Sequence, residues 1–278
     1  MQLGYLPDPI STKDLNGNAR VGSHVDTVRG SQYTERDFED LKVGFTAIHQ
    51  GDVDLSPHCR ETNQFQLQAC AGNATTVALE MINSIEGKPH VDLSRLFTYS
   101  MSRMLQDDDQ NGQNDLDKDA GTYIRLCFDV LSRFGVCRET TWPYETDKVF
   151  TSPSLLAQQE ATGHHVKGYY RIRTDGQDRI NDILTALRAN HPIVFGTKID
   201  QAFTQLANEG PVDKPKGSTI GGHAMIIVGY ISGKGFLIKN SWSKKWGSGG
   251  FCFMTPEYLM WEDTNDLWVP TIGTVFTK

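Results

Sequence analysis

The chain has 278 residues, of which 38% are hydrophobic and 22% are charged, a composition typical of a globular protein with a sizeable core. Its 27 basic and 34 acidic residues give a formal net charge of −7, which argues against nucleic acid or an anionic membrane as the main partner. The sequence contains neither a signal-peptide pattern nor an apolar run approaching the roughly 20 residues that cross a bilayer. We therefore expect no membrane segment, and the compartment stays unknown, with the cytoplasm as the default.

Residues 1–50 form the first distinct segment of the chain. They are polar, with two nearby prolines, scattered glycines and little periodicity, which predicts an irregular N-terminal arm. The remaining residues, 51–278, are numerous enough for one domain of two lobes.

Three segments have helical periodicity. The first begins at Cys70, the second runs through 124–134 and stops at Gly135, and the third covers 180–187. These patterns predict a mainly helical lobe at about 60–150, followed by one more helix in the next part of the chain.

The second half of the sequence contains short apolar runs rich in Val, Ile and Phe and separated by glycines, a pattern typical of antiparallel strands. These runs lie at 191–199, 223–231, 235–242 and 249–255. They predict a mainly β lobe at about 160–260. The fold class is therefore α+β with two lobes, and the groove between the lobes is the expected place for a functional site.

An acidic stretch at residues 106–119 separates the first two predicted helices, and a solvated loop is its simplest interpretation. A calcium-binding loop is the alternative, because five residues match the first, third, fifth, sixth and ninth positions of such a loop: Asp107, Asp109, Asn111, Gly112 and Asp115. The twelfth position, which should be a bidentate Glu, is Lys118. We favour the solvated loop and expect no metal and no cofactor.

The five cysteines are Cys59, Cys70, Cys127, Cys137 and Cys252, and no CxxC pair among them indicates zinc. Because five is odd, at least one thiol has no partner within the chain. The pairing of the other four stays open.

Cys70 stands in the first turn of its predicted helix, where free N–H groups and the helix dipole favour a thiolate and a lowered pKa. The alternative is a small buried hydrophobe. Gln64, six residues upstream, carries an amide donor that could form an oxyanion hole together with the helix N–H groups. Downstream, His223 could act as general base, and the amide of Asn240 could orient its ring, although each could also be structural.

The order Gln64, Cys70, His223, Asn240, together with GGHAMIIVGY around the histidine and KNSWSKKWGSGGF around the asparagine, resembles the papain family of cysteine peptidases. The segments GYLPDP, VDLSPHC, CAGNA, FGVCRETTWPY, HPIVFGTKI and PEYLMWEDTNDLWV are similar to its bacterial and phage branch, so the resemblance covers nearly the whole chain. It implies a papain-like fold, with a helical left lobe, an antiparallel β-barrel right lobe and the active-site cleft between them.

The resemblance also implies residue roles. Cys70 would be the nucleophile, His223 its acid–base partner and Asn240 the residue that orients the imidazole, with Gln64 and the Cys70 amide as oxyanion hole. For the substrate it implies four further positions. Trp242 would shield the Asn–His hydrogen bond, Trp246 would line the leaving-group side, Gly121 would pair with the extended substrate and Gly222 would leave a specificity pocket open. A simple turn is the alternative for Gly121.

Some positions depart from the pattern of the family. Phe65 and Ser243 stand where many members have glycine, and Gln68 adds bulk near the cleft, so specificity is not carried over. With four catalytic positions intact, we expect an active cysteine endopeptidase that acts on peptide or protein substrates as a monomer. The alternatives are an inactive papain-like binding module and a Cys–His amidase or transferase. Residues 1–45 either restrain the cleft, as in a zymogen, or strap the β lobe.

Overall fold

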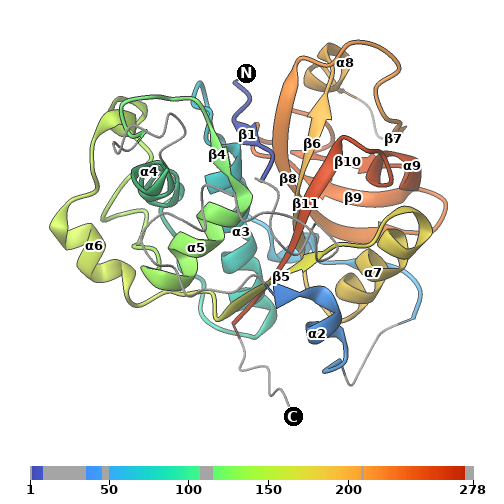
Figure 1. Cartoon of the computed structure of the whole chain (residues 1–278), viewed down its shortest axis with the longest axis horizontal. Helices are drawn as coiled ribbons and strands as arrows, with labels where there is room; N and C mark the ends of the chain where they lie inside the picture. The colour runs from blue at the N-terminus through green and yellow to red at the C-terminus, as the bar shows by residue number, and fades with distance from the viewer. Residues whose placement is uncertain (1, 9–35, 46–49, 107–114, 208–209, 273–278) are drawn as a thin grey trace, which may run out of the picture.

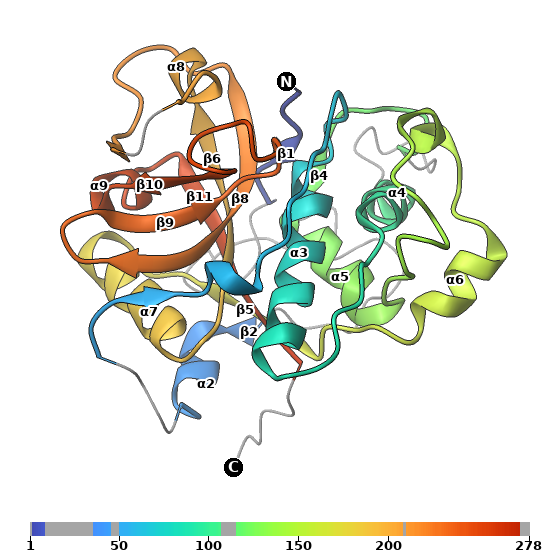
Figure 2. The ribbon, with the colours of Figure 1, turned by 180° about the vertical axis from the view of Figure 1, so that it is seen from behind.

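The computed structural model describes residues 2–8, 36–45, 50–106, 115–207 and 210–272. Figure 1 shows helices α3, α4, α5 and α6 gathered on one side and the large sheet on the other, with α7 and α2 beside the sheet. Figure 2 shows the same division from behind. Within the described part of the chain, no helix is long and apolar enough to span a bilayer.

The helical side is built around α3, which packs against both α4 and α5. A Cβ at Gly72 of α3 would lie 2.9 Å from the Tyr99 Cβ on α4, so the two helices approach closely only because this residue is glycine. The helices of this side are α3 (Cys70–Ile85), α4 (Arg95–Leu105), α5 (Ile124–Arg133) and α6 (Leu155–Ala161). Short 3-10 turns lie at Ser56–His58 and Thr146–Phe150.

The sheet side has an antiparallel core in the order β5-β11-β6-β8-β9-β10. At one end β2 pairs with β5 in parallel, and at the other end β7 pairs with β10 in parallel. A short strand, β3 (Val53–Asp54), also pairs with β8. The strand bounds are β2 (Arg36–Asp37), β5 (Gly168–Ile172), β6 (Ile193–Ile199), β7 (Pro211–Val212), β8 (Gly221–Ile231), β9 (Gly235–Lys239), β10 (Phe251–Met254) and β11 (Thr264–Thr271).

Four further helices accompany the sheet: α2 (Phe38–Lys42), α7 (Gly176–Arg188), α8 (Gln201–Thr204) and α9 (Pro256–Leu259). Only α7 among them is longer than five residues, and it covers β5, β6 and β8. A separate two-stranded sheet joins β1 (Tyr5–Leu6) to β4 (Thr122–Tyr123) in parallel. Residues 5–6 are therefore held beside the start of α5.

The predicted α+β class is confirmed, and so are the helix that begins at Cys70 and the four predicted strands. The sequence pattern does not indicate a helix in the segment that forms α4. The reason is that α4 is buried around most of its circumference, including Arg95 and Arg103, so it shows no clean apolar stripe. The prediction of an irregular arm also missed α2, which places Phe38 and Leu41 in the core.

All five cysteines are unpaired thiols in the structure, which answers the question of disulfide pairing that the sequence left open. The described residues contain no group of three or more His, Cys, Asp or Glu side chains that could hold a metal. The calcium alternative depends mainly on residues 107–114, which lie outside the described residues.

Candidate active site

The fold brings the four predicted site residues together from one helix, one strand and two loops. Cys70 is the first residue of α3, and α3 packs against β8, the strand that carries His223. The Cys70 thiol accepts a hydrogen bond from the backbone N–H of Ala224, the residue after His223. Asn240 follows β9, which is paired with β8. The cysteine, the histidine and the asparagine thus meet where α3 begins, beside the sheet.

The hydrogen bonds of His223 fix its tautomer. Its Nε2 lies 2.7 Å from the Oδ1 of Asn240, and the backbone N–H of Ser241 donates to the same oxygen at 2.7 Å. Because a carbonyl oxygen only accepts, Nε2 must carry the proton. The neutral ring then has its lone pair on Nδ1, which is buried and has no hydrogen-bond partner among the described residues. The ring is therefore positioned to accept a proton at Nδ1.

An aromatic cluster covers this pair of residues. The Trp242 ring stacks on the His223 ring with centroids 4.4 Å apart and planes at 22°. Phe203 and Trp246 pack edge-on against Trp242, and Trp246 donates its indole N–H to the Phe203 carbonyl. Trp246 itself is buried, with only 4% of its surface exposed, so it contacts the site through Trp242. Water is excluded from the side of the imidazole that Trp242 covers.

Gln64 is held rigidly in the loop that precedes α3. Its Oε1 accepts a hydrogen bond from the Ser241 hydroxyl at 2.7 Å, and its backbone N–H donates to the Ser241 carbonyl. Its Nε2 donates to the Leu67 carbonyl and, also at 2.9 Å, to the carbonyl of Gln2. No sequence pattern marks Ser241 as part of this arrangement, although Ser241 follows Asn240 directly.

The N-terminal segment 2–8 occupies this site. Figures 1 and 2 both place β1 between β4 and β8. The Thr122 N–H donates to the Gly4 carbonyl at 2.9 Å, and a Cβ at Gly121 would overlap that same carbonyl. On the other side, a Cβ at Gly222 would lie 2.6 Å from the Tyr5 carbonyl oxygen. Both glycines therefore face an extended peptide, which here belongs to the chain itself.

Burial favours the neutral forms of both Cys70 and His223 in this arrangement. Cys70 is fully buried, and burial raises the pKa of its thiol to about 11, although N–H groups of Ala224, Gly4 and Ala71 act in the opposite direction. Burial lowers the pKa of His223 to about 4, against a smaller effect of Asn240. The predicted lowering of the Cys70 pKa is therefore wrong for this state. The helix terminus does supply N–H groups, but the covered thiol has lost the water that would solvate a thiolate.

Two departures noted in the sequence have a counterpart in the backbone. Phe65 and Ser243 adopt φ values of 51° and 63°, in the left-handed region that glycine adopts without strain. The chain thus keeps the glycine-like backbone at both positions at some cost in strain. The Phe65 side chain is 53% exposed and lies against Tyr144, and Gln68 is tied to the backbone carbonyl of Asp119.

Comparisons with known proteins find similarity over most of the chain. The sequence profile described as "Papain family cysteine protease" matches residues 58–261. An uncharacterized peptidase C1-like protein of Acanthamoeba polyphaga mimivirus is 33% identical over 228 residues, which cover 78% of this chain and 71% of that protein. Cysteine proteinase 3 of Entamoeba histolytica is 26% identical over 74% of this chain, which spans only 60% of that protein's length.

Solved structures are also similar to this chain. Xylellain, a cysteine protease from Xylella fastidiosa, matches with a TM-score of 0.75 and 26% identity, over 98% of this chain and 96% of that one. Bromelain from Ananas comosus in complex with the E64 inhibitor matches with a TM-score of 0.61 and 19% identity, over 81% of this chain and all of that one. The second likeness shows a shared fold.

The covered thiol leads to a prediction for a pH titration. Because burial raises the pKa of Cys70 to about 11, its thiolate should be scarce at neutral pH and should form only as the pH approaches that value. The thiolate is followed by its ultraviolet absorbance in the native chain, and the same titration of Cys70→Ser is subtracted to remove the signal of other groups. A Cys70 thiolate signal that is already complete at neutral pH would contradict the neutral pair.

Proposed function

The chain belongs to the papain family of cysteine proteases, and we propose that it is an endopeptidase that cleaves peptide bonds through an acyl-enzyme on Cys70. It is a cysteine-type peptidase with the α+β papain-like fold of its relatives. The near full-length likeness to a bacterial protease and the relative in a giant virus support a place in the bacterial and phage branch.

The hydrogen bond between His223 and Asn240 is the observation that carries the proposed mechanism. It leaves Nδ1 as the free acceptor, and the Cys70 thiol lies against the N–H of Ala224, the residue next to His223. Nδ1 takes the proton of the thiol, and the sulfur attacks the substrate carbonyl. The imidazolium then gives that proton to the leaving amine, and water hydrolyses the thioester with His223 as base.

The negative charge of the tetrahedral intermediate needs fixed donors. Gln64 Nε2 and the Cys70 backbone N–H supply them, because Ser241 already holds the Gln64 side chain in one orientation. Trp242 keeps water from the His223–Asn240 bond, and Trp246 supports Trp242 on the leaving-group side.

The N-terminal segment 2–8 restrains this machinery by imitating a substrate. Its Gln2 carbonyl takes the Gln64 donor, and its Gly4 carbonyl takes the Thr122 N–H beside Gly121. In the direction from N- to C-terminus, the segment runs from Gln64 toward Gly222. A substrate runs the other way, because an acyl half that lies over Gly121 must have its C-terminal end at Cys70. The arm therefore lies in the opposite sense to a substrate, which fits restraint and not cleavage.

The arm of residues 1–50 has two roles in this proposal. Segment 2–8 fills the cleft of the catalytic domain, 51–278, between its helical lobe at 60–150 and its β lobe at 160–260. Residues 36–42 strap the β lobe, since β2 pairs with β5 and Lys42 bonds to Asp182 of α7 at 3.0 Å. Removing the whole arm would disturb both contacts, so the restraint is better tested by a single substitution.

Gly4→Ala provides that test. A Cβ at Gly4 would overlap the backbone oxygen of Gln68, which cannot move aside, so the arm must leave the cleft. Peptide hydrolysis by the full chain should increase at least about tenfold, the effect of roughly 1.4 kcal/mol of lost arm binding. Gly210→Ala is the matched control, because nothing lies within 4 Å of a Cβ there. Equal turnover in the native chain and in Gly4→Ala would remove autoinhibition from the account.

Asn240→Ala tests the orienting role in the Gly4→Ala background. Without the Oδ1 acceptor the imidazole loses its fixed tautomer, and kcat/KM should fall by roughly 10²-fold, within the range of general acid–base catalysis. Asn181→Ala, on the exposed face of α7, is the control and should be neutral. A loss below threefold would show that Asn240 is dispensable.

The proposed peptidase activity itself is tested with an epoxide inhibitor that traps thiols, followed by mapping of the adduct. We expect the label on Cys70 and no hydrolysis by Cys70→Ala. Labelling at another residue, or hydrolysis that survives Cys70→Ala, would reject the mechanism. A folded chain that is labelled but cleaves no peptide would direct attention to the amidase or transferase alternative, and one that is neither labelled nor active to a binding module.

A further inference from the structure

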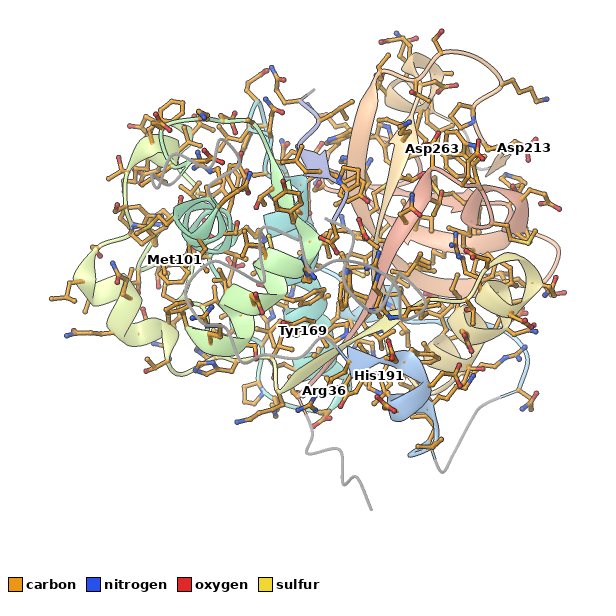
Figure 3. The ribbon with its side chains drawn as sticks, in the orientation of Figure 1. Arg36, Met101, Tyr169, His191, Asp213 and Asp263 are labelled. Atoms are coloured by element: carbon orange, nitrogen blue, oxygen red, sulfur yellow. The ribbon has the colours of Figure 1, made fainter. Side chains whose placement is uncertain are left out.

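A small cavity lies between α3 and the end of β9. α3 packs against the sheet, and Figure 3 shows side chains filling the region between them. Asn73 and Val77 of α3 line the cavity, and so do Lys239 and Asn240. Asn73 comes three residues after Cys70, so it lies on the same face of α3 as the nucleophile. The cavity has a volume of about 10 Å³, at the lower limit of the roughly 10–15 Å³ that one water molecule needs.

Two polar atoms on the lining of this cavity are buried without a partner. Asn73 Oδ1 and Asn240 Nδ2 have no hydrogen bond among the described residues. Asn73 is fully buried, and Asn240 is 1% exposed. A buried polar group that lacks a hydrogen bond destabilises the fold, and native structures rarely leave one unpaired. Both atoms therefore point to a small polar ligand.

Neighbouring hydrogen bonds fix the orientation of the two side-chain amides. Asn73 Nδ2 donates to the Ala69 carbonyl at 2.9 Å, and Asn240 Oδ1 accepts from the Ser241 N–H at 2.7 Å. If either amide were turned over, two acceptors or two donors would face each other. The unpaired atoms are therefore one acceptor, on Asn73, and one donor, on Asn240.

The chemistry of these two atoms decides which ligand fits. An anion would face the Asn73 oxygen, and the cavity is too small for ions of the size of chloride. A metal cation would face the Asn240 N–H and the Lys239 ammonium, which lines the same cavity and donates to the Asn240 carbonyl at 2.5 Å. A water molecule donates and accepts at once, so it alone satisfies both amides within this volume.

A water at this place would also complete a network around the catalytic groups. The Tyr144 hydroxyl accepts from Asn73 Nδ2 at 3.4 Å and donates to the Gln64 carbonyl at 3.2 Å. Gln64 Oε1 in turn accepts from the hydroxyl of Ser241, the neighbour of Asn240. The only gap in this ring lies between Asn73 and Asn240. The water closes it and joins the oxyanion residue to the residue that orients the imidazole.

We propose that the cavity binds one water molecule between Asn73 Oδ1 and Asn240 Nδ2, and that Asn73 is thereby a positioning residue for Asn240. The inference rests on the proposed function, in which Asn240 orients the His223 ring. With the water bound, the Asn240 amide is held at both ends, at Oδ1 by the Ser241 N–H and at Nδ2 by the water. Without it, the amide turns more freely and the acceptor of His223 Nε2 is less well fixed.

A crystal structure of the native full chain tests the binding site without reference to activity. We expect one water at about 2.7–3.2 Å from both Asn73 Oδ1 and Asn240 Nδ2, the range of ordinary hydrogen bonds. The water should be absent from Asn73→Leu, which removes the acceptor. A cavity without density, or a direct bond between the two amides, would overturn the proposal whether or not the chain is a peptidase.

A double-mutant cycle tests the positioning role. In the Gly4→Ala background, Asn73→Leu should lower kcat/KM roughly tenfold, the effect of one lost hydrogen bond. The loss should fall on kcat, because the water positions the acid–base pair and not the substrate. In the Asn240→Ala background the same substitution should change kcat/KM less than about twofold, since its effect passes through Asn240. An equal loss in both backgrounds would refute the positioning role, and Cys70-dependent hydrolysis that Asn73→Leu leaves unchanged would refute it while the proposed function stands.

Thr76→Val is the matched control for the loss of a buried polar group on α3. Thr76 is fully buried, donates to Thr98 Oγ1 at 2.8 Å and is not among the residues that line the cavity. The variant should keep the kcat of the Gly4→Ala chain, with active enzyme counted by titration with an epoxide inhibitor so that misfolded protein does not lower kcat. An equal fall of kcat in Thr76→Val and Asn73→Leu would assign the effect to helix packing and overturn the role of Asn73.

Discussion

The burial of the Cys70 thiol is the constraint on which the rest of the structure depends. Cys70 is the first residue of α3, and this helix packs closely against both α4 and β8. The sheet brings His223 and Asn240 to the same place, and Ser241 connects Asn240 to Gln64. Residues of both lobes therefore surround the Cys70 sulfur. A segment that covers this atom raises the pKa of the thiol and so changes its charge.

The burial by segment 2–8 explains why Cys70 and His223 are uncharged although every expected residue of the site is in place. Burial by the arm favours the thiol over the thiolate and the imidazole over the imidazolium, and these two effects act together. The proton transfer that would create the ion pair becomes favourable once water or a substrate replaces segment 2–8. In this account the arm restrains the enzyme twice, since it occupies the donors and also removes the charge.

Much of the fold and of the site could be predicted from local sequence patterns. The apolar stripe after Cys70, the glycine-separated strands and the NSW motif each depend on neighbouring residues, and they locate α3, β8 and Asn240. The sequence left restraint of the cleft as one of two roles for the arm and could not decide between them, because the contacts of Gln2 and Tyr5 join residues more than 60 positions apart. The same long separation hid the hydrogen bond from Tyr5 to Asp266, which lie 261 positions apart in the chain.

Hydrogen exchange at the backbone amide of Thr122 tests the central claim most directly, because this N–H donates to the Gly4 carbonyl when the arm fills the cleft. In the native full chain the amide should exchange slowly, and in Gly4→Ala it should exchange at least tenfold faster while the amides of α3 keep their protection. An amide that exchanges equally fast in both chains would show that segment 2–8 does not occupy the cleft in solution, and the account of a covered, neutral Cys70 would fail.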